Sequence, residues 1–179
     1  GIFMYPFNFE NIITYNKSDG LIENDAFALC VDKMKNIWIG HKFVNLDLIE
    51  KKSIKNIKLS SSQVSVGRIG KILEHPDGPM IVSSDEGLFI SKANRNDNNS
   101  FINIDLEISK NRVNKFQPIK DIVLDKKGNI YVASQENVHI ISKDELLRKE
   151  IIGRRLDLGK NRIFAIEVDN TGAIWYSDT

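Results

Sequence analysis

The chain has 179 residues, with 25 Lys and Arg against 24 Asp and Glu, and 41% of its residues are hydrophobic. This length is enough for one domain with a buried core, and the composition is that of a globular chain. The even balance of charge argues against a dedicated nucleic-acid binder, and no apolar run approaches the ~18 residues of a membrane-spanning helix. A single cysteine, Cys30, excludes an internal disulfide and a cysteine-based zinc cluster. We therefore expect no metal, no cofactor, and no nucleic-acid or membrane contact in this segment.

The predicted elements begin with an outer strand at 12–15, and four strand–turn–strand units then follow at 28–40, 72–83, 122–133 and 166–177. After the first unit comes a lysine-bearing outer strand at 54–59, which suits a sheet edge. The second unit is followed by strands at 87–90 and 101–106, with a polar loop at 94–100 between them. The third is followed by a strand at 138–141 and a helical turn at 142–149 with Ser142 as its N-cap.

One landmark position, at the start of the turn, recurs in all four units as Asp32, His75, Asp125 and Asp169, at spacings of 43, 50 and 44 residues. A period of 40–50 residues made of short strands is typical of a β-propeller blade. We predict an all-β fold of four-stranded antiparallel blades, about three and a half to four of them, as a single partial propeller (1–179) of a larger ring. The approximate repeats are 9–60, 61–106, 107–158 and an incomplete 159–179.

The repeated turn and second strand have a clear chemical pattern. An Asp at the start of a turn can accept backbone N–H groups, and a glycine three residues later supplies a positive φ. Lys35 occupies the glycine position in the first copy, so that turn should carry mild strain or a different geometry. A large residue on the second strand is followed, two positions later, by a small one, which suits strands that converge where blades stack. The pairs are Trp38 and Gly40, Ile81 and Ser83, Tyr131 and Ala133, and Trp175 and Ser177.

The opening pattern Phe9-x-x-x-Ile13-x-Tyr15-x-x-x-Asp19-Gly20-Leu21-x-x-Asn24, followed by Asp32 and Asn36-Ile37-Trp38-Ile39-Gly40, resembles the two-component regulator propeller repeat. The segment 161–175 and the Gly-Leu pair at 87–88 resemble the same family, and the resemblance covers nearly the whole chain. The two middle copies lack its Trp, and the second also lacks its Asp. Phe43-Val44 stands where the family has Gly-Leu, which puts the third strand of that blade in question.

The resemblance implies a biological setting. Such repeats form the extracytoplasmic, periplasmic sensor region of bacterial regulators, often hybrid histidine kinases that respond to glycans. It implies that this segment senses a glycan or a related small molecule, that it is not itself catalytic, and that its parent is membrane-anchored. No intact signal peptide is present in this chain, because the aromatic residues 1–9 lack a basic region.

Ligand-binding candidates come from the segments just before each innermost strand, which line one rim of a propeller. Seven and eight residues before the landmarks stand Asp25, Arg68 and Arg162, and Asn24 and Asn161. Two guanidinium groups at a channel mouth could hold a carboxylate, a sulfate or a uronic acid in bidentate fashion. Alternatively, the arginines pair with nearby acids or cover apolar surface, and the asparagines cap turns.

Other conspicuous residues are predicted to be structural. Trp38, Trp175 and Tyr131 should pack in the core rather than stack on sugars, and Phe27 and Phe164 should lie between blades. The landmark carboxylates of Asp32, Asp125 and Asp169 should cap turns, because no second acid stands at a calcium-loop spacing. Cys30 should be an inert buried thiol, and His139 should be solvated or hydrogen-bonded.

Two other functions remain open. A propeller enzyme, such as a lyase or a glycan-active hydrolase, predicts a convergent cluster of His, acid and metal, whereas a protein-interaction scaffold predicts an exposed apolar patch. The predicted strands amount to one outer strand, three complete units and a fourth unit that stops after its second strand. We therefore expect exposed blade faces at both ends, covered by a second copy in a homodimer or by missing blades.

Overall fold

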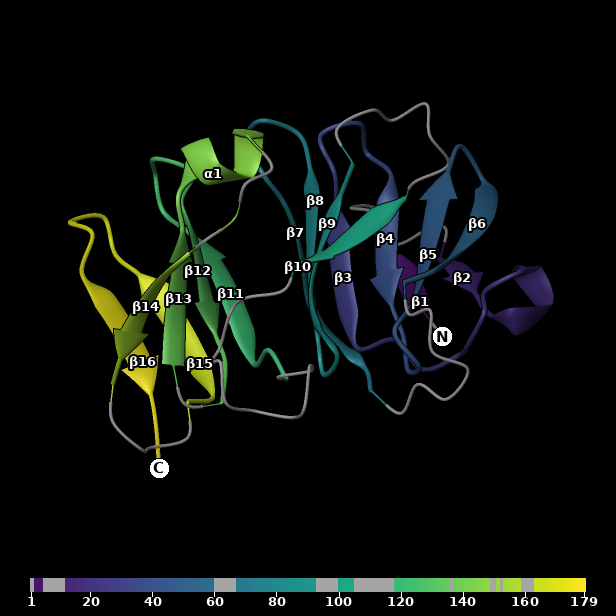
Figure 1. Cartoon of the computed structure of the whole chain (residues 1–179). Helices are drawn as coiled ribbons and strands as arrows, with labels where there is room; N and C mark the ends of the chain where they lie inside the picture. Colours follow the sequence, from purple (N-terminus) through teal and green to yellow (C-terminus); the bar gives the residue numbers. More distant parts are fainter. Residues whose placement is uncertain are drawn as a thin grey trace.

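The computed structural model describes residues 2–4, 12–59, 67–92, 100–104, 118–135, 137–148, 151, 153–158 and 163–179. In this part of the chain, sixteen strands form three four-stranded antiparallel sheets and two two-stranded sheets, accompanied by two short helices (Figure 1). The sheets stack in a row and do not close into a ring. The prediction of an all-β fold built from antiparallel propeller blades is confirmed.

Each four-stranded sheet is a meander in which consecutive strands pair, as the short turns between them require. Blade A contains β3 (Ala28–Val31), β4 (Ile37–Gly40), β5 (Asn45–Glu50) and β6 (Ser53–Lys58). Blade B contains β7 (Ile69–Glu74), β8 (Met80–Ser84), β9 (Gly87–Ser91) and β10 (Phe101–Ile104). Blade C contains β11 (Asp121–Leu124), β12 (Ile130–Ala133), β13 (Asn137–Ile141) and β14 (Arg154–Asp157), with helix α1 (Lys143–Arg148) between β13 and β14.

The two-stranded sheets lie at opposite ends of the row (Figure 1). The C-terminal sheet, β15 (Ala165–Val168) and β16 (Ile174–Ser177), supplies the first two strands of a fourth blade, as predicted. At the N-terminal end, β2 (Ile13–Tyr15) is the predicted outer strand, but it pairs with an additional strand, β1 (Ile2–Met4). The N-terminal end therefore contributes two strands, not one.

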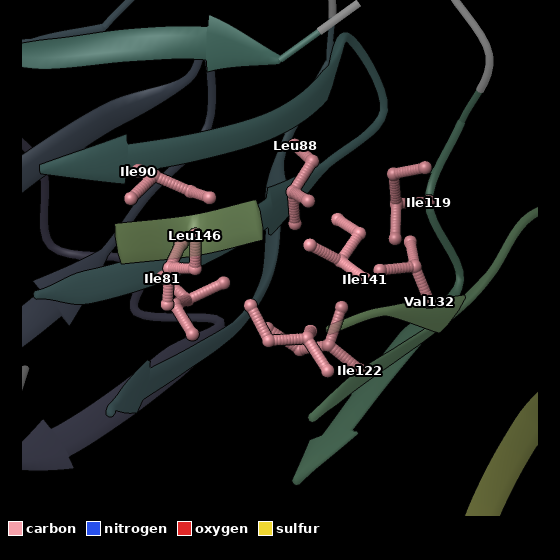
Figure 2. Close-up of a cluster of buried hydrophobic side chains, with 9 residues drawn as sticks. Ile81, Leu88, Ile90, Ile119, Ile122, Val132, Ile141 and Leu146 are labelled. Atoms are coloured by element: carbon pink, nitrogen blue, oxygen red, sulfur yellow. The ribbon is translucent and has the colours of Figure 1, made fainter. Parts of the chain in front are cut away.

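Apolar side chains from facing sheets form the core. One cluster joins blades A and B, one joins blades B and C, and one joins blade C to β15–β16. Figure 2 shows the middle cluster, in which Ile81, Leu88 and Ile90 of blade B face Ile122, Val132 and Ile141 of blade C. Each blade is thus held mainly by its neighbours, which is the way repeat arrays bury their apolar faces.

The same two positions of the repeat build each contact between blades, which we call a joint. One is the large second-strand residue of a blade, and the other is the first-strand residue three positions before the landmark of the next blade. In all three joints both residues are buried in the same cluster. The pairs are Trp38 with Ile72, Ile81 with Ile122, and Tyr131 with Ile166.

The landmark residue organises its turn as predicted. Asp32 Oδ1 accepts hydrogen bonds from the backbone N–H groups of Met34 and Asn36, both at 2.9 Å, and its Oδ2 accepts the Trp38 indole N–H at 3.1 Å. Asp125 and Asp169 repeat the two backbone contacts. In blade B the imidazole of His75 takes this role, because its Nδ1 accepts the backbone N–H of Asp77 at 3.1 Å.

Local backbone strain occurs where residues with a side chain adopt a positive φ. Lys35 adopts a φ of 67°, a left-handed conformation that is costly for residues with a Cβ. In the turn between β4 and β5, Phe43 and Val44 adopt φ values of 58° and 52°. This turn has one residue more than those after β8 and β12. His41 bonds to Asn45 across it, whereas Ser84 pairs with Gly87 and Ser134 with Asn137 across the other two.

The third strand of blade A, which the sequence put in question, is present and begins after this longer turn. β5 forms a full strand of six residues, and the leucine that corresponds to Leu88 is Leu46, which is completely buried. Phe43 and Val44 belong to the turn and do not replace the Gly-Leu pair. Residues 94–99 of the predicted polar loop, as well as 105–106 of the predicted fourth strand of blade B, lie outside the described part of the chain.

Candidate functional site

The segments that precede the first strands meet the ends of the second strands at the edge of the blades opposite the landmark turns. Phe27 precedes β3, Lys42 follows β4, and Arg68 precedes β7. Lys42 and Arg68 form an isolated antiparallel bridge, which ties blade A to blade B at this edge. We call Asp25, Phe27, Lys42 and Arg68 the rim cluster.

Two cations lie close to one aromatic ring in the rim cluster. The Lys42 ammonium lies 5.7 Å from the centroid of the Phe27 ring, and the Arg68 guanidinium carbon lies 5.4 Å from it. Both distances are within the range of a cation–π interaction. The Phe27 side chain remains 38% exposed, so the sequence prediction that it is core between blades is wrong. An aromatic surface and two positive charges are therefore presented together to solvent.

The described carboxylates at this rim contact Lys42, Lys120 and the backbone of Arg68. Lys42 Nζ lies 3.5 Å from Asp25 Oδ2, and both side chains are largely exposed. Asp85 accepts the backbone N–H of Arg68 at 3.1 Å, and its other carboxylate oxygen lies 4.0 Å from Lys120 Nζ. Among the residues that the structure describes, no carboxylate forms an ion pair with the Arg68 guanidinium. Within these residues, no salt bridge has to break before the guanidinium accepts an anionic ligand.

The other predicted rim residues have separate positions. The side-chain oxygen of Asn24 accepts the backbone N–H of Lys17 at 2.9 Å, so Asn24 fastens the short 3-10 helix η1 (Lys17–Asp19). Asn161 and Arg162 lie outside the described residues. Sequence reasoning missed Lys42 and the exposure of Phe27. The one sequence signal for Lys42 was its position next to the end of a predicted second strand.

The three histidines lie apart and are deeply buried. His41 Nδ1 lies 2.9 Å from the backbone oxygen of Asp25, and its Nε2 lies 2.9 Å from Asp47 Oδ2. His75 Nε2 contacts the backbone oxygen of Gly128, in blade C, at 2.7 Å. Burial lowers the pKa of His139 to about 4, with a smaller contribution from the Arg155 charge. These rings are structural contacts that a substrate cannot reach.

Acidic side chains are likewise engaged in structure. Burial alone would raise the pKa of Asp47, but hydrogen bonds from His41, Asn56 and the backbone N–H of Ile22 hold it below its ordinary value. The pKa of Asp32 is lowered in the same way, by its turn and by the Trp38 indole, against the effect of burial. In the described part of the chain, no three His, Cys, Asp or Glu side chains converge as a metal site requires.

No protein-family model matches the sequence, and no curated protein matches it either. Solved structures do match. The extracellular domain assigned to a hybrid two-component system, BT4673, of B. thetaiotaomicron is 16% identical with a TM-score of 0.73, covering 100% of this chain and 24% of that one. The corresponding domain of BT3049 from the same organism is 18% identical with a TM-score of 0.68, covering 92% of this chain and 22% of that one.

A virginiamycin B lyase from Staphylococcus aureus is also similar, at 13% identity and a TM-score of 0.64, over 86% of this chain and 48% of the lyase. The chain thus spans about a quarter of the first two proteins and about half of the third. At these identities the similarity concerns the fold, which sensors and a lyase share. In the described part, no helix has the length and hydrophobicity to cross a bilayer. The propeller fold expected from the repeat is confirmed, and the chain has the blade architecture of these two-component extracellular domains.

Proposed function

We propose that this chain is a ligand-sensing propeller segment of an extracytoplasmic, two-component-type sensor, and that the rim cluster binds an acidic glycan or a related small anion. The observation that carries this proposal is the placement of the Lys42 and Arg68 cations within 6 Å of the ring of the half-exposed Phe27. Arg68 can form a bidentate pair with a carboxylate or sulfate, and the Phe27 ring offers an apolar face to the body of the ligand.

The surroundings of the cluster support recognition rather than catalysis. The histidines are buried and separate, and the landmark carboxylates are occupied by their own turns. Because Lys42 belongs to blade A and Arg68 precedes blade B, an anion held by both would fix the relation between the two blades. This gives a sensor a physical means of relaying occupancy to the rest of a larger, membrane-anchored protein.

The test is calorimetric titration of the chain with a panel of acidic and neutral oligosaccharides, repeated with Arg68→Ala. Loss of a charge-assisted bidentate contact should weaken binding of the acidic ligand at least about tenfold. Lys126→Ala is the matched control, because Lys126 is an exposed cation in the landmark turn of blade C, at the edge of the blades opposite the rim cluster. Undiminished affinity in Arg68→Ala would refute the site.

A further inference from the structure

Three lysines of blade A adopt a backbone conformation that is costly for their residue type. Lys35, Lys51 and Lys52 have φ values of 67°, 48° and 72°. Lys35 stands in the landmark turn, and the corresponding residues of the other blades are all glycines with a positive φ: Gly78, Gly128 and Gly172. Lys51 and Lys52 form the two-residue turn between β5 and β6, where a positive φ at both positions favours Asn-Gly. Each lysine therefore occupies a position where glycine or asparagine would reduce the backbone strain.

The three lysines lie at one edge of blade A, and we call them the lysine edge. In an antiparallel meander the turn between β3 and β4 and the turn between β5 and β6 lie at the same end of the strands, which here is the landmark edge, opposite the rim cluster (Figure 1). All three residues are exposed. The turns project from the ends of the strands, whereas neighbouring blades pack on the faces of the sheets. A blade stacked on blade A would therefore leave the lysine edge open.

The carboxylates next to the lysine edge are already engaged. Asp32 accepts the backbone N–H groups of its own turn and the indole N–H of Trp38. Glu50 Oε2, directly before the second turn, lies 2.7 Å from Lys55 Nζ on β6. Among the residues that the structure describes, no ion pair involves the lysine edge. Blade A thus presents three positive charges without a partner and at a cost in backbone strain, a combination that is typical of functional sites.

We propose that the lysine edge is a second binding surface, which holds the acid groups of a linear acidic polysaccharide. Ammonium groups on long side chains are flexible point charges, so they can follow sulfates or carboxylates at variable spacing along a polymer. Bidentate recognition of a single fixed group uses arginine instead, as the rim cluster offers with Arg68. The two surfaces lie at opposite edges, and this proposal does not depend on the function proposed for the rim.

The two turns lack the features by which other polyanions are recognised. Residues 32–36 and 51–52 contain no arginine and no Phe, Tyr or Trp. Protein interfaces centre on aromatic and arginine anchors, acidic peptide motifs are bound by arginine clusters, and single-stranded nucleic acids stack on aromatic rings. Binding to a bilayer surface uses an apolar face, whereas Met34 is the single exposed apolar residue of these turns. A hydroxyl-rich polymer that carries charges requires none of these anchors.

The test is titration of the whole chain with dextran sulfate, with uncharged dextran as the matched ligand. The double variant Lys51→Asn, Lys52→Gly removes two charges and should weaken binding of dextran sulfate about three- to tenfold at low salt. The same variant should raise the melting temperature, because it installs the residues that this turn favours. Lys51→Gln with Lys52→Gln should weaken binding equally without the gain in stability, since both glutamines keep the strain.

The matched control is the double variant Lys126→Gln, Lys127→Gln. It removes two exposed lysines from the landmark turn of blade C, where neither has a positive φ, and it should leave both affinity and melting temperature unchanged. Each comparison is repeated in an Arg68→Ala chain, which removes the guanidinium of the rim cluster. The effect of Lys51 and Lys52 should persist there, so the failure of one site is distinguishable from the failure of the other.

Three outcomes would overturn the proposal. Unchanged affinity for dextran sulfate in the Lys51→Asn, Lys52→Gly variant, or equal binding of uncharged dextran, would refute a charged surface at this edge. A lower melting temperature in that variant would show that the two lysines are not strained. Binding to phosphatidylglycerol vesicles without binding to dextran sulfate would assign the lysine edge to a lipid surface and refute the polysaccharide.

Discussion

Replacing Gly128 with alanine tests how strongly blades B and C are coupled at their landmark turns. Gly128 has a φ of 85°, and a Cβ at this position would lie 3.0 Å from His75 Nε2 and 3.3 Å from its Cε1. The left-handed backbone alone costs an alanine about 1–2 kcal/mol. Moving the buried His75 ring also breaks its 2.7 Å contact with the Gly128 carbonyl, which adds about 1–3 kcal/mol. We expect Gly128→Ala to lower the free energy of unfolding by about 2–5 kcal/mol.

The matched control is Gly78→Ala, because Gly78 also has a left-handed φ, of 111°, and no atom lies within 4 Å of its added Cβ. It should lose only the backbone contribution, about 1–2 kcal/mol. Urea denaturation followed by circular dichroism measures both variants, and repeating Gly128→Ala in a His75→Ala background isolates the contact. Equal losses for Gly128→Ala and Gly78→Ala would refute the role of His75 as a link between blades.

Three further predictions concern single side chains. Lys35→Gly should raise the free energy of unfolding by about 0.5–1 kcal/mol, because it relieves the left-handed strain, and a drop in urea stability would contradict this. Gly40→Ala should destabilise by about 3 kcal/mol, since its Cβ would lie 2.5 Å from Ile69 Cγ2, and an unchanged melting temperature would count against so tight a joint. The pKa of His139 is about 4 in the folded chain, against 6.5 for an unperturbed histidine. On acidification the unfolded chain therefore binds the proton first, and the free energy of unfolding should fall by about 3 kcal/mol as the pH drops from 6.5 to 4. Denaturation of His139→Gln across this range should show a much flatter profile.

The blades could be predicted from the sequence because their signals are local and repeated. Asp32, Asp125 and Asp169 cap turns through their own neighbouring N–H groups, and these contacts depend on a few adjacent residues. The strain at Lys35 follows from the same local geometry. The Gly-Leu position was assigned to Phe43-Val44 because the turn before β5 has one more residue, which shifts the pattern while the strand itself remains.

Features that depend on distant segments could not be predicted in this way. β1 has only three residues and exists through its pairing with β2 and its packing on blade A. His75, which stands in place of the landmark carboxylate, also contacts the backbone oxygen of Gly128 in the next blade through its Nε2. The rim cluster brings Phe27 and Lys42 together with Arg68, and its members come from two blades. Arg68 was selected from its repeat position, whereas its aromatic partner was expected in the core.

The most direct test of the proposed sensor site compares one acidic oligosaccharide that binds this chain with the same oligosaccharide after reduction of its carboxyl groups. Calorimetric titration at low and high salt measures the contribution of charge. If Lys42 and Arg68 recognise an anion beside Phe27, the acidic form should bind at least about tenfold more tightly, and added salt should reduce the difference. Equal affinities for the two forms would contradict an anion-binding rim.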